Sequence, residues 1–393
     1  MKIVDVSEFY SELGGGVRSY VNQKLDLAAE AGHDLTIVAP GAENRIDVRR
    51  GGKIVWIECP IMPFDRNYRM FWRADDVWHV LDAETPDVVE GSSPWRGGWI
   101  AGCWAGNSLK SLVFHQDFVA GYFHTFLDRV LAPDIIDRLL GWYWRYVQRL
   151  SARYDTTIVA DAWLADRLEN FGLDRPVVVP FGVERGRFSP AQRDKDLRGE
   201  LLARCEIPDN GRLLLAVGRL HPEKRLGTVI DGFARAKAQR PLGLVIVGDG
   251  VSRIAVERHA RRAGNVHMEG EIRDRALLAR YYASADVLVH GSAAETYGLV
   301  VAEAICSGLP VVVPDRGGAA NFASCGRSKI YATGDAGSCA AAILELLDRR
   351  DLAGQPGSCL KASPIGFLDE HFAALFKLYE TLSDAKRAHR ECG

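Results

Sequence analysis

Residues 295–313 read ETYGLVVAEAICSGLPVVV, and this stretch decides the fold. The apolar run Asp286–His290, which comes before this stretch, is typical of a buried strand. The Val- and Ala-rich part of the stretch is typical of a helix that begins near Tyr297 or Gly298. Glu295 then lies just ahead of a helix N-terminus, where free N–H groups attract anions, and Glu303 lies in the second turn. Two interpretations are open: both carboxylates contact a hydroxylated ligand, or one caps the helix and the other is a surface residue.

Outside this stretch, short β-branched runs alternate with amphipathic helices. Continuous apolar runs favour parallel strands covered on both faces by helices. We therefore expect an α/β protein with two doubly wound, Rossmann-like domains, 1–182 and 183–365, that face each other across a crevice. A tail helix over about 366–388 is expected to return to the first domain. The expected strands are residues 2–6, 35–39, 54–57, 88–90, 112–114, 157–159, 177–179, 213–217, 243–247, 266–268, 287–290 and 311–313, with a short one near 330.

The composition is that of a soluble globular protein. The chain has 393 residues, of which 47% are apolar and 25% charged, and a formal net charge of −2. This balance gives no reason to expect nucleic acid as a partner, because nucleic acid usually requires a concentrated basic surface. We see no apolar run long enough to span a membrane and no cleavable signal at the start, so we expect a cytoplasmic protein.

Cysteine and histidine spacing predicts neither disulfides nor a metal site. The eight cysteines are scattered without a C-x-x-C pattern, which fits a reducing compartment. Asp194-Lys-Asp196 has the D-x-D form of a metal site but lies in a charged linker, and the ten histidines form no H-x-x-x-H pair. We therefore expect no metal and no cofactor.

Two loops that follow expected strands carry features of anion binding. Residues 217–225 read VGRLHPEKR, and Arg219 and Lys224 stand where a helix begins, which suits a diphosphate. Residues 12–17 read ELGGGV, and these glycines let the backbone approach a ligand closely. Each feature alone is also compatible with solvated surface charge or with simple turn geometry.

Three further features lie at the ends of expected strands. VGDG at residues 247–250 and the loop Glu269–Ile272 both contain glycine. His115 directly follows the expected strand 112–114, where it either contacts a ligand or is a buried structural histidine. Because the carboxyl ends of parallel strands share one edge of a sheet, these features could line one crevice.

The stretch Ala120–Tyr154 is dense in aromatic residues interleaved with arginine, as is the shorter stretch 67–73. Amphipathic helices of this kind can lie at a lipid interface, with aromatic rings at headgroup depth and cations toward anionic lipid. Aromatic packing in a helical core is the alternative. An anionic membrane surface is therefore a candidate partner of residues 120–154, and binding it would make the protein peripheral on the inner face of the membrane.

Taken in this order, the motifs resemble those of glycosyltransferase family 4, the retaining nucleotide-sugar enzymes of the GT-B fold. The resemblance rests on GGGV near the start, VPFGVERGRF at 179–188, VGRLHPEKR, VGDG and the stretch 295–313, whose two glutamates match the family's E-x7-E signature. It implies two Rossmann-like domains, with the acceptor mainly on the first and the nucleotide-sugar donor on the second.

The resemblance implies roles for particular side chains. Arg219 and Lys224 would neutralise the donor diphosphate, Glu295 would contact the donor sugar, and His115 would face the sugar near the reacting carbon. Asp117 stays open as a covalent nucleophile. Within the donor-binding set, Glu303 would bond the ribose hydroxyls. The backbone amides of residues 297–300 would meet the sugar and the phosphate. That set is Gly15, Gly16, Gly218, Gly248, Ile272, Tyr297, Gly298, Leu299, Val300 and Glu303.

The chain departs from the family pattern in three places. His290-Gly291-Ser292 stands where many relatives have Pro-Ser, Tyr297 replaces the common Phe, and the stretch Gly317–Asn321 lacks a Glu that often follows its paired glycines. The last departure bears on the preference for the donor sugar more than on catalysis.

The predicted function is a retaining, metal-independent hexosyltransferase. It would use a UDP- or GDP-sugar and a lipid-linked or saccharide acceptor, in glycolipid or surface polysaccharide synthesis. The open alternatives are a nucleotide-sugar epimerase, another GT-B-like enzyme such as a phosphorylase, and a noncatalytic nucleotide-sugar-binding protein.

Overall fold

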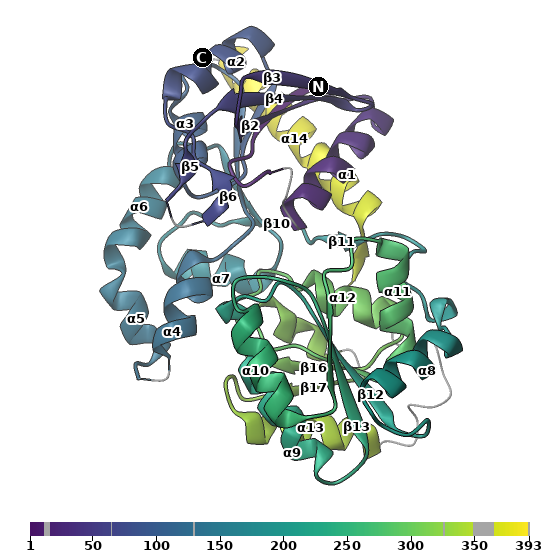
Figure 1. Ribbon diagram of the computed structural model, residues 1–393. Coiled ribbons are helices and arrows are strands. Elements are labelled where there is room, and N and C mark those ends of the chain that lie inside the picture. The colour runs from purple at the N-terminus through teal and green to yellow at the C-terminus, as the bar shows by residue number, and fades with distance from the viewer. Residues whose placement is uncertain (12–15, 64, 129, 325–326, 349–364, 392–393) are drawn as a thin grey trace. The chain divides into compact units, whose positions relative to one another are not determined.

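The computed structural model describes residues 1–391 except 12–15, 64, 129, 325–326 and 349–364 (Figure 1). The chain divides into two compact units. Unit 1 contains residues 1–116, 137–180 and 369–393, and unit 2 contains residues 117–136 and 181–368. Each unit is built on its own parallel sheet, so the predicted α/β class with two doubly wound sheets is confirmed.

Unit 1 has an eight-stranded sheet in the order β10-β9-β8-β7-β1-β2-β4-β3, in which only β3 pairs antiparallel. The strands are β1 Lys2–Val6, β2 Asp34–Gly41, β3 Arg45–Arg49, β4 Gly52–Glu58, β7 Val88–Gly91, β8 Leu109–Phe114, β9 Thr156–Val159 and β10 Val177–Val178. Its helices are α1 Gly16–Glu30, α2 Ala74–Glu84, α3 Arg96–Cys103, α6 Gly141–Ser151, α7 Ala162–Asn170 and α14 Leu368–Glu391. β5 Ile61–Met62 and β6 Asp65–Arg69 form a separate antiparallel pair.

Unit 2 has a six-stranded, all-parallel sheet in the order β14-β13-β12-β15-β16-β17. The strands are β12 Arg212–Val217, β13 Leu242–Val247, β14 Val266–Gly270, β15 Val287–Val289, β16 Val311–Pro314 and β17 Ser328–Tyr331. Its main helices are α8 Lys195–Arg204, α9 Leu226–Lys237, α10 Arg253–Ala263, α11 Arg275–Ser284, α12 Leu299–Cys306 and α13 Ala336–Asp348. The short strands β11 Gly182–Val183 and β18 Gly366–Phe367 pair with each other.

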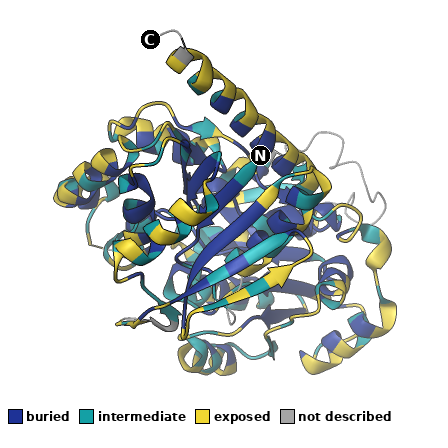
Figure 2. Cartoon of the chain, turned by 90° about the horizontal axis from the view of Figure 1, so that it is seen from above, coloured by how far each residue is buried: buried dark blue, intermediate teal, exposed yellow. Residues whose placement is uncertain are grey.

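Both sheets reverse their strand order beside their first strand. The reversal lies between β1 and β7 in unit 1 and between β12 and β15 in unit 2. Central strands are buried while the covering helices keep exposed outer faces (Figure 2). Doubly wound sheets bind ligands outside the carboxyl ends of their strands at this switch point, which makes the loops there the places to search.

Every strand expected from the sequence is present, but the division of the chain differs from the predicted one. Unit 2 begins at Phe181, close to the predicted boundary, and the tail helix belongs to unit 1 from Asp369 on. Residues 117–136, which were assigned to the first domain, belong to unit 2. The cause is packing, because Asp128 of this segment is paired with Arg225 of unit 2.

The segment 117–136 contains a π-helical turn Val119–His124, the short helix α4 Thr125–Leu127 and the first part of α5 Pro133–Leu139.

Within the part of the chain that the structure describes, no helix is both long and apolar enough to cross a membrane.

Candidate functional site

The candidate site of unit 2 is formed by two loops at the switch point of its sheet. The loop Gly218–Arg225 follows β12, and the loop His290–Gly298 follows β15 and leads into α12. These loops carry the predicted residues Arg219, Lys224 and Glu295. The fold therefore brings the three residues to the edge where a doubly wound sheet binds its ligand.

Lys224 and Glu295 form a close ion pair. Nζ of Lys224 lies 2.6 Å from Oε1 of Glu295 and 3.4 Å from Oε1 of Glu223. Nε2 of His290 lies 3.3 Å from the same oxygen of Glu295. Burial alone would raise the pKa of Glu295, but the Lys224 ammonium and His290 lower it well below its usual range. Lysine and carboxylate are therefore both charged at neutral pH.

Burial alone would lower the pKa of Lys224, but the charges of Glu295 and Glu223 raise it. Arg219 is the more accessible cation. Its side chain is 48% exposed, against 20% for Lys224, and its Nη2 lies 3.7 Å from Oε1 of Glu223. A guanidinium at the surface beside a half-buried ammonium is a suitable pair of donors for a diphosphate.

Glu303 lies in the second turn of α12, as predicted, and its carboxylate is buried. Oε1 accepts a hydrogen bond from Nη2 of Arg275 at 2.9 Å, and Oε2 accepts one from the hydroxyl of Tyr282 at 3.1 Å. Nε of Arg275 also donates to Glu184 at 3.1 Å. Burial raises the pKa of Glu303 although Arg275 acts against it. Two residues of α11 thus hold this carboxylate in place.

Three of the predicted glycines have backbones that favour glycine. The φ angles of Gly218, Gly248 and Gly298 are 144°, 142° and 94°. A Cβ atom on Gly248 would lie 2.0 Å from the carbonyl oxygen of Gly218, so the loops after β12 and β13 touch. Only glycine permits so close an approach of two backbones. The N–H of Gly248 donates to the carbonyl of Gly270 at 2.7 Å. This bond links the loop after β13 to the loop after β14, which leads to Ile272.

The start of α12 presents backbone amides. None of the described side chains caps this helix at Gly298, and Leu299 and Val300 are its first two residues. Such uncapped amides are suited to an anion. The ring of Tyr297 packs against Phe181 and Phe322 at centroid distances of 5.8 and 5.3 Å, so this side chain supports the loop.

In unit 1, His115 directly follows β8 and meets the ring of Tyr20 edge-on at a centroid distance of 5.1 Å. Burial lowers the pKa of His115 to about 4. The imidazole is therefore neutral at pH 7 and can both donate and accept a hydrogen bond. Gly16 is the first residue of α1, whereas Gly15 lies outside the described residues.

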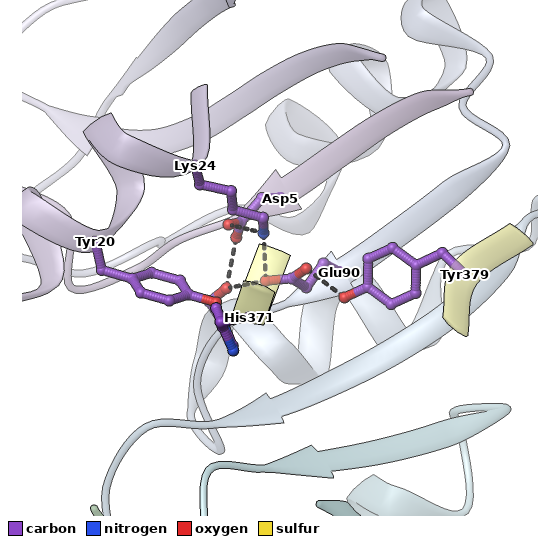
Figure 3. Close-up of polar contacts among 7 residues, drawn as sticks. Asp5, Tyr20, Lys24, Glu90, His371 and Tyr379 are labelled. Carbon is purple, nitrogen blue, oxygen red and sulfur yellow. Dashed lines mark hydrogen bonds and ion pairs between the residues drawn. The ribbon is translucent and has the colours of Figure 1, made fainter. Parts of the chain in front are cut away.

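A buried charge cluster at the switch point of unit 1 was not predicted (Figure 3). Lys24 of α1 is fully buried, and its Nζ lies 2.9 Å from Asp5 on β1 and 2.6 Å from Glu90 on β7. The hydroxyl of Ser92 lies 2.6 Å from Asp5, and the hydroxyl of Tyr379 donates to Glu90. Burial raises the pKa of Asp5 to about 6 although Lys24 acts against it. The cluster joins α14 to the two central strands of the sheet.

His371 is a second anchor of α14 (Figure 3). Its Nδ1 lies 2.8 Å from the carbonyl oxygen of Pro180, which can only accept, so Nδ1 carries the proton. Nε2 accepts a hydrogen bond from the hydroxyl of Tyr20 at 3.0 Å. Burial lowers the pKa of His371 to about 4, which keeps the ring neutral. Since Tyr20 also touches His115, the tail helix supports a predicted site residue through one tyrosine.

Two aspartates that the sequence raised as candidates act in local structure. Oδ1 of Asp117 accepts from the N–H of Ala120 at 2.9 Å, at the start of the π-helical turn. Asp194 of the D-x-D sequence caps α8 by accepting from the N–H groups of Asp196 and Leu197, both at 2.9 Å. The D-x-D pattern therefore marks a helix cap.

The aromatic stretch 120–154 divides into core and surface residues. Tyr143 and Trp144 of α6 are buried, and Trp144 stacks on Phe171 with ring centroids 3.9 Å apart. Phe126 in unit 2 and Trp142 in unit 1 are 59% and 57% exposed. Much of the aromatic character thus belongs to core packing, and part of it stays available at the surface.

The residues that the sequence did not predict, in the Lys24 cluster of unit 1 and in the candidate site of unit 2, are mainly charged members of ion pairs. Glu223, Arg275 and Lys24 lie in ordinary helical or loop sequence, where nothing marks them as members of ion pairs. In the sequence, His290 ends an expected strand and departs from the family pattern, and neither feature predicts its contact with Glu295. Its position 3.3 Å from Glu295 gives the departure a physical role.

Comparison with known proteins identifies relatives of both halves of the chain. The family model described as "Glycosyltransferase Family 4" matches residues 14–187, and the model "Glycosyl transferases group 1" matches residues 211–349. A GDP-mannose-dependent alpha-mannosyltransferase of Mycolicibacterium smegmatis is 29% identical, over 89% of this chain and 90% of its own.

Two further matches agree with these. A GDP-mannose-dependent alpha-(1-6)-phosphatidylinositol dimannoside mannosyltransferase of Mycobacterium tuberculosis is 28% identical, over 80% of this chain and 79% of its own. The solved structure of a glycosyltransferase from Rickettsia africae is similar in fold, with a TM-score of 0.69 at 16% identity, over 97% of this chain and 98% of its own.

Proposed function

This chain belongs to glycosyltransferase family 4, and from that premise we propose that it is a retaining mannosyltransferase that uses GDP-mannose. The two mannosyltransferase relatives are named for that donor, which supports GDP-mannose over other nucleotide sugars. The observation that carries the proposal is the ion pair between Lys224 and Glu295, with Arg219 beside it at the switch point of unit 2.

In this proposal the donor diphosphate binds at the loop Gly218–Arg225. Lys224 has three N–H donors, one of which bonds Glu295 while Glu223 forms an ion pair with the same ammonium at 3.4 Å, so a further N–H can meet a phosphate oxygen. Arg219 adds a planar fork of donors. As the bond between the sugar carbon and the diphosphate breaks, negative charge grows on the leaving group. Cations already held in position stabilise that charge without reorganisation.

In unit 2 the sugar is held by an ionised carboxylate. Glu295, with its strongly lowered pKa, accepts hydrogen bonds from sugar hydroxyls. The acceptor hydroxyl attacks from the face that the diphosphate leaves. Its proton passes to the departing phosphate oxygen, and the new bond keeps the anomeric configuration.

We propose that this reaction requires no added metal or cofactor. Arg219 and Lys224 supply positive charge where the diphosphate would lie, which is the role that a divalent cation has in other transferases. Activity is therefore expected to persist in EDTA.

The proposed acceptor is a lipid-linked or saccharide molecule at the inner face of the membrane, in glycolipid or surface polysaccharide synthesis. The tuberculosis relative is named for a phosphatidylinositol dimannoside acceptor. The exposed aromatic residues Phe126 and Trp142 support peripheral contact with anionic lipid. Flotation with anionic vesicles at low salt tests this part, and a protein that stays with the unbound fraction contradicts it.

A transfer assay with purified protein and a panel of UDP- and GDP-sugars tests the whole proposal. We expect turnover of GDP-mannose, dependence on an acceptor such as a phosphatidylinositol mannoside, and no loss in EDTA. Donor turnover without acceptor favours an epimerase instead. Tight donor binding without any transfer favours a noncatalytic binding protein.

A further inference from the structure

The segment Asp117–Ile136 contacts the loop that carries Lys224. Oδ2 of Asp128 lies 2.7 Å from Nη2 of Arg225, and both side chains are close to nine-tenths buried. The same Nη2 lies 3.4 Å from the carbonyl oxygen of His124. Tyr122 meets His221 edge-on at a centroid distance of 5.8 Å. One short segment thus touches two positions of the loop 218–225.

Arg225 has an unfavourable backbone conformation. It has φ 44° and ψ 39°, a left-handed conformation that is unfavourable for a residue with a side chain, and it joins the turn Pro222–Lys224 to the start of α9. Such a conformation persists only where surrounding contacts enforce it. The buried hydrogen bonds to Asp128 and His124 are contacts of that kind.

The backbone of Lys224 and Arg225 also packs closely against Gly291. A Cβ atom there would lie 2.4 Å from the carbonyl oxygen of Lys224 and 3.2 Å from that of Arg225. Gly291 directly follows His290, which contacts Glu295. The peptide between Lys224 and Arg225 is therefore in close contact with Gly291, and the Arg225 side chain is bonded to the segment that carries Asp128. A shift of this peptide would change the 2.6 Å contact of Lys224 with Glu295.

We propose that the Asp128–Arg225 ion pair is a clamp that positions Lys224 for the donor diphosphate, so that Asp128 and Arg225 are positioning residues for donor binding. The inference rests on the proposed function, because it assigns the diphosphate to Lys224. The clamp comes from the segment that continues the chain beyond His115, so a part of the sequence outside the main donor fold sets the geometry of the donor loop.

A matched ion pair exists elsewhere in the chain and serves as the control. Asp137 accepts two hydrogen bonds from Arg167 at 2.9 and 2.8 Å, with side-chain exposures of 9% and 14%. The corresponding exposures are 9% for Asp128 and 11% for Arg225. Both residues of the control pair belong to unit 1, whereas the loop 218–225 belongs to unit 2.

The experiment measures the dissociation constant of GDP by calorimetry, the donor KM and kcat, and the melting temperature for four proteins. These are the wild type, Asp128→Asn, Arg225→Gly and Asp137→Asn. Glycine at 225 accepts the left-handed backbone but removes the guanidinium. We expect both clamp variants to bind GDP at least fivefold more weakly, to raise the donor KM and to lower kcat, because a displaced Lys224 stabilises the leaving diphosphate less well. Asp137→Asn should lower the melting temperature and leave GDP binding within twofold of wild type.

Several outcomes overturn the clamp. The clamp is contradicted if both clamp variants bind GDP within twofold of wild type. It is also contradicted if Asp128→Asn weakens GDP binding and Arg225→Gly does not, because Asp128 would then act without the guanidinium of Arg225. If Asp128→Asn does not fold, Arg225→Gly alone carries the test. A wild type that binds no nucleotide diphosphate contradicts the proposed function itself, which separates the two failures.

Discussion

Lys224 stands between two carboxylates, and removing it should affect chemistry more than folding. We expect Lys224→Ala to lower kcat/KM for the donor by about 100-fold or more, the size seen when a preorganised donor to developing negative charge is lost. Steady-state kinetics with the purified variant measures this. Lys329→Ala, which breaks a lysine–glutamate pair between β17 and α13, is the control and should keep near wild-type rates. Equal rates for the two variants would remove Lys224 from the site.

His371 should make stability depend on pH. The unfolded histidine takes up a proton near pH 6.5, whereas burial holds the folded pKa at about 4. The unfolded state therefore binds more protons between these values, so this stability contribution is full above pH 6.5 and is lost as the pH falls toward 4. The loss amounts to about 3 kcal/mol for this one group.

Urea unfolding at several pH values between 7 and 4 measures the effect. His371→Gln should flatten the dependence, and His115, whose pKa is also lowered, should account for part of what remains. Thr381→Val, a change at an exposed residue of α14 that does not titrate, should leave the profile unchanged. A wild-type slope in His371→Gln would contradict the neutral, buried state of this ring.

At the scale of elements, α14 is attached to the sheet of unit 1 by polar contacts inside an apolar interface. Tyr379→Phe removes the hydroxyl that donates to Glu90 and leaves a buried carboxylate oxygen short of a donor. We expect a loss of about 1–3 kcal/mol in the free energy of unfolding. Tyr146→Phe is the control, because its hydroxyl makes only a 3.4 Å contact with the carbonyl of Trp95. Indistinguishable urea midpoints for the two variants would show that the bond contributes nothing.

The elements themselves were largely predictable, and the exceptions have a physical reason. Runs such as residues 242–247 are apolar throughout because a parallel strand is buried on both faces. β3, with the sequence RIDVR, was missed because an exposed edge strand needs no apolar run. The start of α12 was predictable because a Val- and Ala-rich run begins there, and the structure has Gly298 with a left-handed backbone directly before the helix.

At the scale of the whole molecule, the motifs predicted the donor half better than the division of the chain. Loops at the ends of strands carry their own signatures, so the sequence pointed to Arg219, Lys224 and Glu295, which the fold brings to one edge of the sheet. Contacts between distant residues leave no such local signal. Asp128 and Arg225 are 97 positions apart, and Lys24 and Glu90 are 66 apart, so neither pairing could be read from spacing.

The central claim is a retaining transfer from a nucleotide sugar, and the anomeric configuration of the product tests it most directly. GDP-mannose labelled with carbon-13 at C1 should be incubated with the protein and a mannoside acceptor, and the product examined by NMR through its one-bond C1–H1 coupling. Because the donor is α-linked, the account predicts an α-mannosidic product that forms about 100-fold more slowly when Lys224→Ala replaces the wild type. A β-linked product, or an α-linked product formed equally well by that variant, would contradict it.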